Sequence, residues 1–462
     1  MNSSSLPNWL RRHWEGEGGI GALLPIAVPM VVTSIFDTLM TFIDRVFLAH
    51  VGKEEMSASM AGGITNWMCI CLFVGLISYV STLVAHYYGA ERKNECPQVV
   101  HQAILLAVAC YPICLLTCWL GSHALGGEGH SAVQTRLERV YFWYLAVGNI
   151  VALMRSAYSG FFAGIGKTKV IMVANCVSLV VNLVVNYVLI FGKCGFPAMG
   201  IVGAAIGTVL AGVAMAVVIG VWYYREIAKP EYCGGPARHF EWEKLRPLIV
   251  FGFPNGVGNF LGMASFVMVV SLLSRYGADM AAATTITFNW DNVSFFPMLG
   301  MQIGVSTLVG QFMGAKRPDL AERAAYSGYK LAISYAFIGT LVFSLLPTLL
   351  VSVFTPESSG VDYTEVRKIA VPMIRASSLY LFFDAITLIS DGALKGAGDT
   401  FWTMIIGVSW NWLVAVALWF AIARCHFDPI PAWLVFVFCI MGHGIILVWR
   451  FERGRWKQIK MI

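Results

Sequence analysis

The chain alternates long apolar stretches with short breaks of polar, Gly or Pro residues. A helix needs about 20 mostly apolar residues to cross the hydrocarbon core of a bilayer, and the stretches repeatedly reach that length. An outer-membrane barrel would instead show weak alternation over strands of about ten residues. The pattern predicts twelve membrane-spanning helices, at residues 20–48, 57–85, 98–120, 133–163, 169–191, 199–224, 246–274, 281–311, 327–353, 367–394, 401–423 and 431–450.

Composition agrees with this prediction. Of the 462 residues, 58% are hydrophobic and 13% are charged, whereas soluble domains have roughly 45–50% apolar and about 25% charged residues. The mean hydropathy of +0.69 applies to the whole chain, which excludes a soluble enzyme with a single anchor. We therefore expect an all-α polytopic membrane protein.

The positive charges predict the orientation in the membrane. The chain has 32 Lys and Arg, and 21 of them fall at the termini and the even-numbered loops, against 8 at the odd-numbered loops. Cytoplasmic loops carry the excess of Lys and Arg, so both termini are expected in the cytoplasm of a multi-pass protein of the cell inner (plasma) membrane. The predicted cytoplasmic parts are an N-terminal arm at 1–19, a linker at 225–245 and a tail at 451–462.

Two halves of the chain share short motifs at fixed offsets, which indicates an internal duplication. Val-Ser-Thr-Leu-Val occurs at 80–84 and again at 305–309, and a Gly-Ala pair with an Arg two residues later follows each copy. Further on, the Gly-x-x-x-Gly-x-Gly-x-Thr pattern of 160–168 recurs at 392–400. We expect two parallel six-helix repeats, an N-lobe at 20–224 and a C-lobe at 246–450, around a central cavity, an arrangement typical of secondary transporters.

A carboxylate within a predicted span costs several kcal/mol and needs a reason, and four of them stand out. Asp37 and Asp44 are seven residues apart on the first span, and Asp384 and Asp391 repeat this spacing on the tenth. Such carboxylates can simply pair with intramembrane arginines, and Asp391 lies near a cytoplasmic end where water reaches it. We expect Asp44 to bind a proton on one side and release it on the other, and Asp384 and Asp391 are candidates for coupling in the C-lobe.

Other candidates lie near these acids. Asn182 and Asn186 are one turn apart on the fifth span, so their amides can face a carboxyl group or a small cation, or can serve as contacts between helices. Pro25 and Pro29 remove backbone donors from the helix that carries Asp44, which permits a bend that protonation could control.

Aromatic and Met side chains are abundant, and most of them are expected to face lipid or core. A few could bind flat organic cations through apolar and cation–π contacts, namely Phe36, Met40, Trp290 and Tyr380. Carboxylates outnumber cations on the helices expected at the cavity, which favours cationic cargo.

Several segments together resemble one family. Residues 42–52 after Pro29, the Gly-Ile-Gly-Lys-Thr loop at 164–168, the Leu-Ile-Phe-Gly run at 189–192 after the two Asn, and residues 199–208 are similar to the multidrug and toxic compound extrusion (MATE) transporters. The resemblance covers nearly the whole chain. It implies export of organic cations or other xenobiotics by antiport with H⁺ or Na⁺, with an N-lobe cation site at Asp44, Asp37, Asn182, Tyr141 and Thr208, and with Asp384 implicated in the C-lobe.

Two departures from the family pattern bear on the coupling ion. Asn186 stands where several relatives carry a second Asp on the fifth helix, and Gly262 stands where one subfamily has a Glu on the seventh. With fewer carboxylates, H⁺ coupling is favoured, although Asp44, Asn182, Asn186 and Thr208 could still hold Na⁺. No firm metal site is expected, and no cofactor besides the coupling ion.

Two other functions would fit parts of the sequence. A lipid-linked oligosaccharide flippase of the same superfamily would share the two-lobe shape, but tends towards a basic cavity. An intramembrane aspartyl protease could use the Gly-Ala-Gly-Asp motif at 396–399, yet this motif is the second copy of the repeat's loop. No phosphate-binding or metalloprotease motif is present, so we expect neither enzyme activity nor ATP as a driving force, and no nucleic acid. A monomer is expected, in contact with the lipid bilayer and small organic cations.

The eleven cysteines show no paired-ligand spacing. Several of them lie inside apolar runs without partner histidines, which predicts small apolar packing residues: Cys69, Cys71, Cys110, Cys114 and Cys118.

Overall fold

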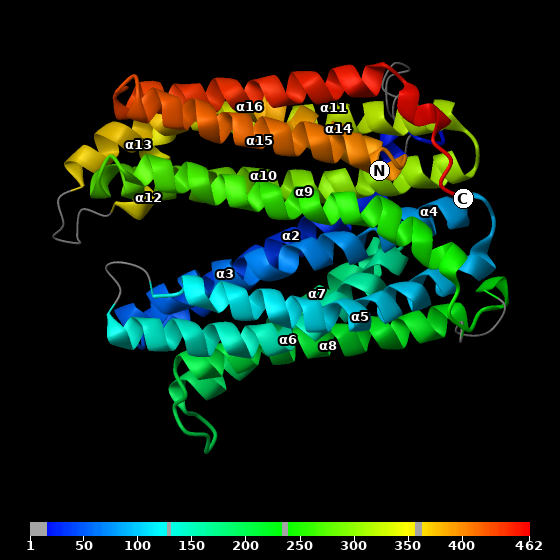
Figure 1. Ribbon diagram of the computed structural model, residues 1–462, viewed down its shortest axis with the longest axis horizontal. Coiled ribbons are helices and arrows are strands. Elements are labelled where there is room, and N and C mark those ends of the chain that lie inside the picture. The colour runs from blue at the N-terminus through cyan, green and yellow to red at the C-terminus, as the bar shows by residue number, and fades with distance from the viewer. Residues whose placement is uncertain (1–15, 127–130, 233–238, 356–362) are drawn as a thin grey trace, which may run out of the picture. The chain divides into compact units, whose positions relative to one another are not determined.

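A computed structural model describes residues 16–126, 131–232, 239–355 and 363–462. Most of the predicted N-terminal arm and part of the predicted linker lie outside these residues. Within them the chain forms α-helices joined by turns and short 3-10 helices, without strands (Figure 1). The helices are α2 (Ile20–Ala49), α3 (Lys53–Ser78), α4 (Val80–Gly89), α5 (Cys96–Gly121), α6 (Ala132–Gly164), α7 (Thr168–Phe191), α8 (Ile201–Ile227), α9 (Trp242–Ser274), α10 (Ala278–Gly314), α11 (Pro318–Leu345), α12 (Pro347–Phe354), α13 (Thr364–Ser377), α14 (Leu381–Gly396), α15 (Thr400–Ala423) and α16 (Pro429–Glu452).

The helices confirm the predicted all-α membrane fold. In the described part of the chain, eleven helical segments are long and apolar enough to cross a membrane. Helices α13 and α14 together would form one more span, bent by 51° at the short break between them, which brings the number to twelve. The break between α11 and α12 falls at Pro347, which has no backbone N–H to continue the preceding helix. The sequence did not predict the bend in the tenth span, nor the interruption at Tyr79 between α3 and α4.

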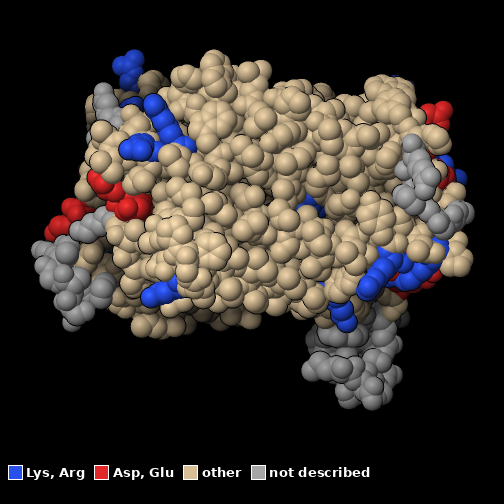
Figure 2. Space-filling model, turned by 90° about the horizontal axis from the view of Figure 1, so that it is seen from below, with Lys and Arg blue, Asp and Glu red and all other residues tan. Residues whose placement is uncertain are grey.

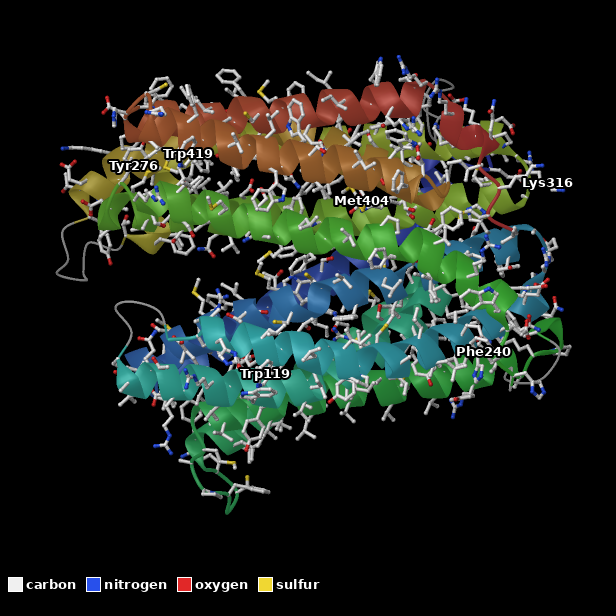
Figure 3. The ribbon with its side chains drawn as sticks, viewed as in Figure 1. Trp119, Phe240, Tyr276, Lys316, Met404 and Trp419 are labelled. Carbon is white, nitrogen blue, oxygen red and sulfur yellow. The ribbon has the colours of Figure 1, made fainter. Side chains whose placement is uncertain are left out.

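Apolar side chains cover the outer surfaces of the helices. Figure 3 shows Trp119 of α5 and Trp419 of α15 on the outer side of their helices, and their side chains are 52% and 42% exposed. On the face shown in Figure 2, Lys, Arg, Asp and Glu gather near the helix ends, with an almost uncharged surface between them. Such a surface suits a protein whose helices are surrounded by lipid.

Close contacts divide the chain into two compact units. Among the described residues, the first unit contains those of 1–27, 261–309 and 318–460, and the second contains those of 28–260, 310–317 and 461–462. At three points the chain passes from one unit to the other inside a helix: within α2 after Ala27, within α9 after Phe260 and within α10 after Val309. The lobe boundaries expected from the repeat, at the linker 225–245, stay a prediction.

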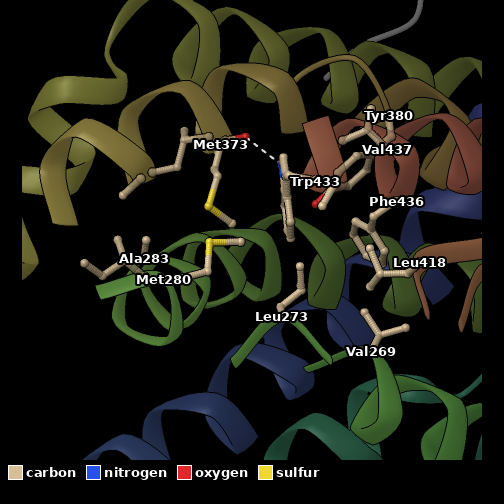
Figure 4. Packing of buried hydrophobic residues seen from close by; sticks show 14 of the residues in the cluster. Val269, Leu273, Met280, Ala283, Met373, Tyr380, Leu418, Trp433, Phe436 and Val437 are labelled. Atoms are coloured by element: carbon tan, nitrogen blue, oxygen red, sulfur yellow. Dashed lines mark hydrogen bonds between the residues drawn. The ribbon is translucent and has the colours of Figure 1, made fainter. Parts of the chain in front are cut away.

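The core of the first unit is aromatic and sulfur-rich. Trp433 of α16 is fully buried and donates its indole N–H to the carbonyl of Met373 on α13, 3.2 Å away (Figure 4). Phe436 lies beside Trp433, and Leu273 of α9 and Leu418 of α15 complete the packing. Because the indole N–H is satisfied, this large side chain can be buried without an unpaired polar group.

The duplication inferred from sequence is present in the backbone of both units. A Cβ at Gly164 of α6 would lie 2.6 Å from the carbonyl oxygen of Ser81, and a Cβ at Gly396 of α14 would lie 2.5 Å from that of Ser306. Each glycine therefore permits the same close helix approach, at positions matched by the repeat. Three pairs of matched turn residues also share the left-handed conformation: Glu91 with Lys316 (φ 58° and 57°), Gly166 with Gly398 (φ 77° and 95°) and Cys194 with His426 (φ 55° and 50°).

Candidate functional site

Asp44 is the centre of a polar cluster within the second unit. Its side chain, on the second half of α2, is only 8% exposed. The side-chain amide of Asn186 on α7 donates to Oδ1 of Asp44, and the hydroxyl of Thr208 on α8 lies 3.3 Å from Oδ2. Both hydrogen-bond partners are neutral. No ion pair to Asp44 is present in the described part of the chain, so the charge of this carboxyl group is sensitive to what binds there.

Asn186 is held in place by an unusually close approach of α8. A Cβ built on Gly207 would collide with Oδ1 of Asn186, so only glycine leaves room for this amide. Asn182, one turn earlier on α7, is fully buried and lies within interaction range of the Asp44 carboxyl group. Within the residues that the structure describes, Oδ1 of both asparagines is buried and has no hydrogen-bond partner. Two acceptor oxygens thus remain available beside the carboxylate.

The hydroxyl of Thr208 can act as an acceptor toward Asp44. It has a single hydrogen, and the carbonyl oxygen of Ala204 lies closer to Oγ1, at 2.9 Å, than the carboxylate oxygen does. A threonine oxygen that gives its hydrogen to a carbonyl keeps lone pairs for an incoming O–H. Tyr141 of α6, 7% exposed, is near enough to interact with both Thr208 and Asp44.

An apolar cluster packs around one end of this site. Leu48 of α2, Ile190 of α7 and Ile201 of α8 are each at most 2% exposed, and Tyr141 packs with them. The cluster follows Asp44 by one turn along α2. The carboxyl group therefore has apolar packing on that side.

Asp37 lies about 10 Å from Asp44 along the same helix, by the rise of 1.5 Å per residue. The amide of Asn175 on α7 donates to its Oδ1 at 3.1 Å and to the carbonyl of Thr33 at 3.0 Å. Arg155 of α6 is close enough for its charge to act on Asp37, without forming a direct ion pair in the described structure. Unlike Asp44, the Asp37 residue is exposed. The structure brings the two acids into separate surroundings.

The prolines predicted as a hinge lie at a special point of α2. Pro25 and Pro29 are both inside this helix, and the boundary between the compact units falls between them, after Ala27. The hydroxyl of Thr33 bonds back to the carbonyl of Pro29 at 2.9 Å, and Ser34 and Thr38 make the same kind of bond one turn back. Missing donors and back-bonding hydroxyls both favour bending.

In the first unit, Asp384 lies near a second carboxylate. It lies on α14 close to Asp291 of α10, so that the two charges interact. The hydroxyl of Tyr380, one turn before Asp384, donates to Oδ1 of Asp291 at 2.9 Å. Tyr380 is fully buried, so in this structure it holds Asp291 and has no free face for a substrate.

Asp391 and Asp399 are tied into ion pairs. Oδ2 of Asp391 lies 2.8 Å from the ammonium group of Lys395 and accepts from the amide of Gln302 at 2.6 Å. Both carboxylate oxygens of Asp399, only 3% exposed, accept from Arg450, at 2.9 and 3.2 Å. A protease dyad needs two carboxyl groups that share one proton, whereas Asp391 and Asp399 are each paired with a cation of their own.

The other predicted substrate residues have ordinary surroundings. Trp290 donates its indole N–H to the carbonyl of Leu350 at 2.9 Å and packs against the core of the first unit. Phe36 and Met40 on α2 are partly buried. Their contact with a substrate stays a prediction. Among the described residues, no group of three or more His, Cys, Asp or Glu could hold a metal ion.

Comparison with known proteins decides the family. The MatE family profile matches residues 29–188 and 254–420, most of the chain. The chain belongs to the MatE family. It is 23% identical, over 94% of its length and 93% of the relative's, to the "Probable multidrug resistance protein NorM" of Thermotoga maritima. It is 25% identical to the "Multidrug resistance protein PmpM" of Pseudomonas aeruginosa, with 100% and 96% coverage.

The fold of this MatE protein is also that of solved transporters. An outward-facing "multidrug resistance MATE family transporter of the MOP superfamily" superimposes with a TM-score of 0.85 at 18% identity, covering 97% of this chain and 98% of that one. The expectation of a MATE transporter fold is confirmed.

Three contacts of this MatE protein were missed from the sequence. Asn175 holds Asp37, Asp291 faces Asp384, and Gln302 holds Asp391. A signal existed for Asn175, which continues the polar stripe of Asn182 and Asn186 on α7 at helical spacing. A signal also existed for Asp291, a carboxylate inside the apolar span predicted at 281–311.

Proposed function

We propose that this chain is a secondary active multidrug exporter that expels organic cations in exchange for H⁺, by alternating access. The relatives' names support multidrug transport, and the resemblance to their family extends over most of the chain. One observation supports the coupling role above others: Asp44 is nearly buried and its hydrogen-bond partners are an amide and a hydroxyl, not a cation.

The arrangement around Asp44 suits a group that gains and loses a proton. When ionised, the carboxylate accepts from Asn186 at Oδ1. When protonated, its O–H can donate from Oδ2 to Thr208, whose own hydrogen stays on the carbonyl of Ala204. Both states are then satisfied by hydrogen bonds, while the net charge between α2, α7 and α8 changes by one. Na⁺ is the alternative coupling ion, since Oδ1 of Asn182 and of Asn186 could join Asp44 and Thr208 as oxygen ligands.

The proposed conformational step is a change in the bend of α2. Neutralising Asp44 changes the hydrogen bonds that connect the second half of this helix to α7 and α8. The prolines at 25 and 29 then let that half move relative to the first half. Substrate would leave as the space beside α2 in the second unit narrows. Phe36, Met40 and the exposed Asp37 lie on this helix and are the substrate contacts we propose.

We further propose that the protein works as a monomer in the cell inner membrane with both termini in the cytoplasm. The excess of Lys and Arg at the termini and even loops supports this orientation. The driving force is an ion gradient, without ATP, any other cofactor or nucleic acid, and no catalytic step is involved.

The test is efflux of a fluorescent organic cation from proteoliposomes under separately imposed proton and sodium gradients. Wild type is compared with Asp44→Asn and with Asp279→Asn, which removes a carboxylate at the exposed start of α10. We expect transport driven by the proton gradient, lost in Asp44→Asn and kept in Asp279→Asn.

Other outcomes contradict parts of the proposal. If sodium alone drives efflux, the proton assignment is wrong and the Asp44 cluster is a metal site. If neither gradient drives it, the organic-cation proposal fails. The flippase function would then be tested with a fluorescent lipid-linked oligosaccharide.

A further inference from the structure

The end of α16, in the first unit, carries exposed basic side chains without an acidic partner. Arg453, Arg455 and Lys460 form neither an ion pair nor a side-chain hydrogen bond with any residue that the structure describes. The neighbouring acid Glu452 is already engaged, because it accepts from the hydroxyl of Tyr326 at 2.8 Å. The guanidinium groups of the two arginines therefore keep their donors for a ligand from outside the chain.

The backbone that carries these arginines is fixed by its neighbours. Gly454, with a φ of 65°, ends α16, and a short 3-10 helix follows at Arg455–Gln458. Within it, Trp456 is fully buried, stacks on Phe451 with ring centroids 5.1 Å apart, and donates its indole N–H to the Phe451 carbonyl at 2.8 Å. Because this segment is already ordered, a ligand loses less free energy in ordering it.

Arg453 is stacked on an outward-facing tryptophan. Trp449, one turn earlier on α16, is 51% exposed, and the guanidinium carbon of Arg453 lies 3.6 Å from the centroid of its ring. Stacking uses the face of the guanidinium and leaves the N–H groups at its edge available for an anion. Tryptophan is enriched where a membrane meets water. The pair therefore indicates the level of the lipid headgroups at this end of α16.

A second stack of arginine on tryptophan adjoins the first. The guanidinium carbon of Arg450 lies 5.4 Å from the ring centroid of Trp402, which is exposed at the start of α15. Helices α15 and α16 lie side by side here (Figure 1). The charge of Arg450 is compensated by Asp399, whereas Arg453 has no such carboxylate among the described residues. The surface thus combines exposed aromatic rings with an uncompensated guanidinium.

An apolar stripe leads away from this surface along α16. Phe438 and Ile445 are each 60% exposed, and they precede Trp449 by eleven and four residues, so the three side chains share one outer face of the helix. A free phosphate ion would contact the arginines alone. A phospholipid would use the whole surface, because its phosphate accepts from the guanidinium groups while an acyl chain lies on the stripe.

We propose that Trp449, Arg453 and Arg455 bind the headgroup of an anionic phospholipid whose acyl chain lies along Phe438 and Ile445. This end of α16 is predicted to be cytoplasmic, and anionic lipids give the cytoplasmic leaflet its negative surface potential. A zwitterionic lipid such as phosphatidylcholine carries its own ammonium group and needs no arginine. The proposal rests on the membrane fold and does not depend on the transported substrate or the coupling ion.

The test uses the full-length protein in detergent micelles and phosphatidylglycerol that carries a diazirine in its acyl chain. After illumination, crosslinks are mapped on peptides, and the lipid concentration that gives half-maximal crosslinking to α16 is measured. Unlabelled phosphatidylglycerol, phosphatidylcholine and inorganic phosphate serve as competitors. Wild type is compared with Arg453→Gln/Arg455→Gln and with the matched control Arg136→Gln/Arg139→Gln, which removes two exposed arginines of α6 and changes the net charge equally.

We expect crosslinks on α16 between Phe438 and Trp449 that unlabelled phosphatidylglycerol displaces, phosphatidylcholine displaces less well, and inorganic phosphate leaves in place. The double Gln variant at 453 and 455 should raise the half-maximal concentration roughly 25-fold, since each basic residue near an anionic surface contributes about fivefold. The control on α6 should leave it nearly unchanged. Trp449→Leu keeps an apolar side chain but loses the stack, and should raise the concentration about two- to fivefold.

Three results would overturn the proposal. Equal displacement by the two lipids would show that the headgroup charge is not recognised. Displacement by inorganic phosphate would show a site for a free anion. An equal effect of the two double variants would show a general effect of net charge. Each variant is checked for folding by size-exclusion chromatography, and the replaced side chains are all exposed, so the packing of α16 should persist.

Discussion

Gly207 offers a test of the Asp44 site without touching any of its polar groups. Replacing it with Ala places a methyl group against Oδ1 of Asn186, and the next nearest atom is Cγ of the same side chain, at 2.8 Å. The obstacle is the end of a flexible side chain, so the amide should turn away while the backbone stays in place. We therefore expect the substitution to break the hydrogen bond from Asn186 to Asp44.

The size of this effect follows from the partner's charge. A hydrogen bond to a charged group contributes about 1.5–3 kcal/mol, which is roughly tenfold to a hundredfold in an equilibrium that depends on it. We expect Gly207→Ala to lower proton-driven efflux by about that factor and to lower the thermal midpoint of the purified protein. The matched control is Gly212→Ala on the same helix, where the new Cβ meets only Val151, at an ordinary 3.6 Å.

A double-mutant cycle shows whether the effect passes through Asn186. In an Asn186→Ala background the amide is already absent, so Gly207→Ala should cost little more. The reasoning is refuted if Gly207→Ala costs as much in that background as in wild type. It is also refuted if Gly207→Ala and Gly212→Ala behave alike.

Three further predictions concern other contacts. Asp399→Asn should destabilise the protein by about 3 kcal/mol or more, because it leaves the guanidinium of Arg450, only 12% exposed, without its carboxylate partner, and adding Arg450→Met should restore most of the loss, as thermal unfolding can measure. Gly314→Ala should lower the yield of folded protein, since the new Cβ would meet a backbone carbonyl of α4 that cannot move aside; size-exclusion profiles that match wild type would contradict this. Asp37→Asn should leave the thermal midpoint nearly unchanged, as the exposed side chain can still accept from Asn175, but should weaken binding of an organic cation measured by fluorescence quenching.

The spans, the duplication and the Asp44 cluster could all be predicted from sequence for physical reasons. Bilayer thickness sets the length of each apolar run, and a charge or amide inside such a run is costly enough to be conspicuous. Asp44 and Asn186 stood out for this reason, and the structure joins them directly. Tyr141 and Thr208 came only from the family resemblance, because nothing in their own spacing indicates an acid nearby.

Pairings between distant helices could not be predicted in the same way. Which carboxylate meets Lys395, Asp291 or Arg450 depends on helix rotation and tilt, which neighbouring helices determine. The sequence of a single helix shows which residues are costly to bury, but not which residues of other helices will pair with them.

The matched turns described above also have a use in protein engineering. Glu91, Lys316, Cys194 and His426 adopt a left-handed backbone that costs a residue with a side chain roughly 1–2 kcal/mol. Glycine at any of them would remove that cost without altering a helix. Because these residues occur as two pairs, glycine can be placed in one turn of a pair while the matched turn is kept unchanged for comparison. The resulting variants would differ stepwise in stability and could be used for crystallisation and ligand screening.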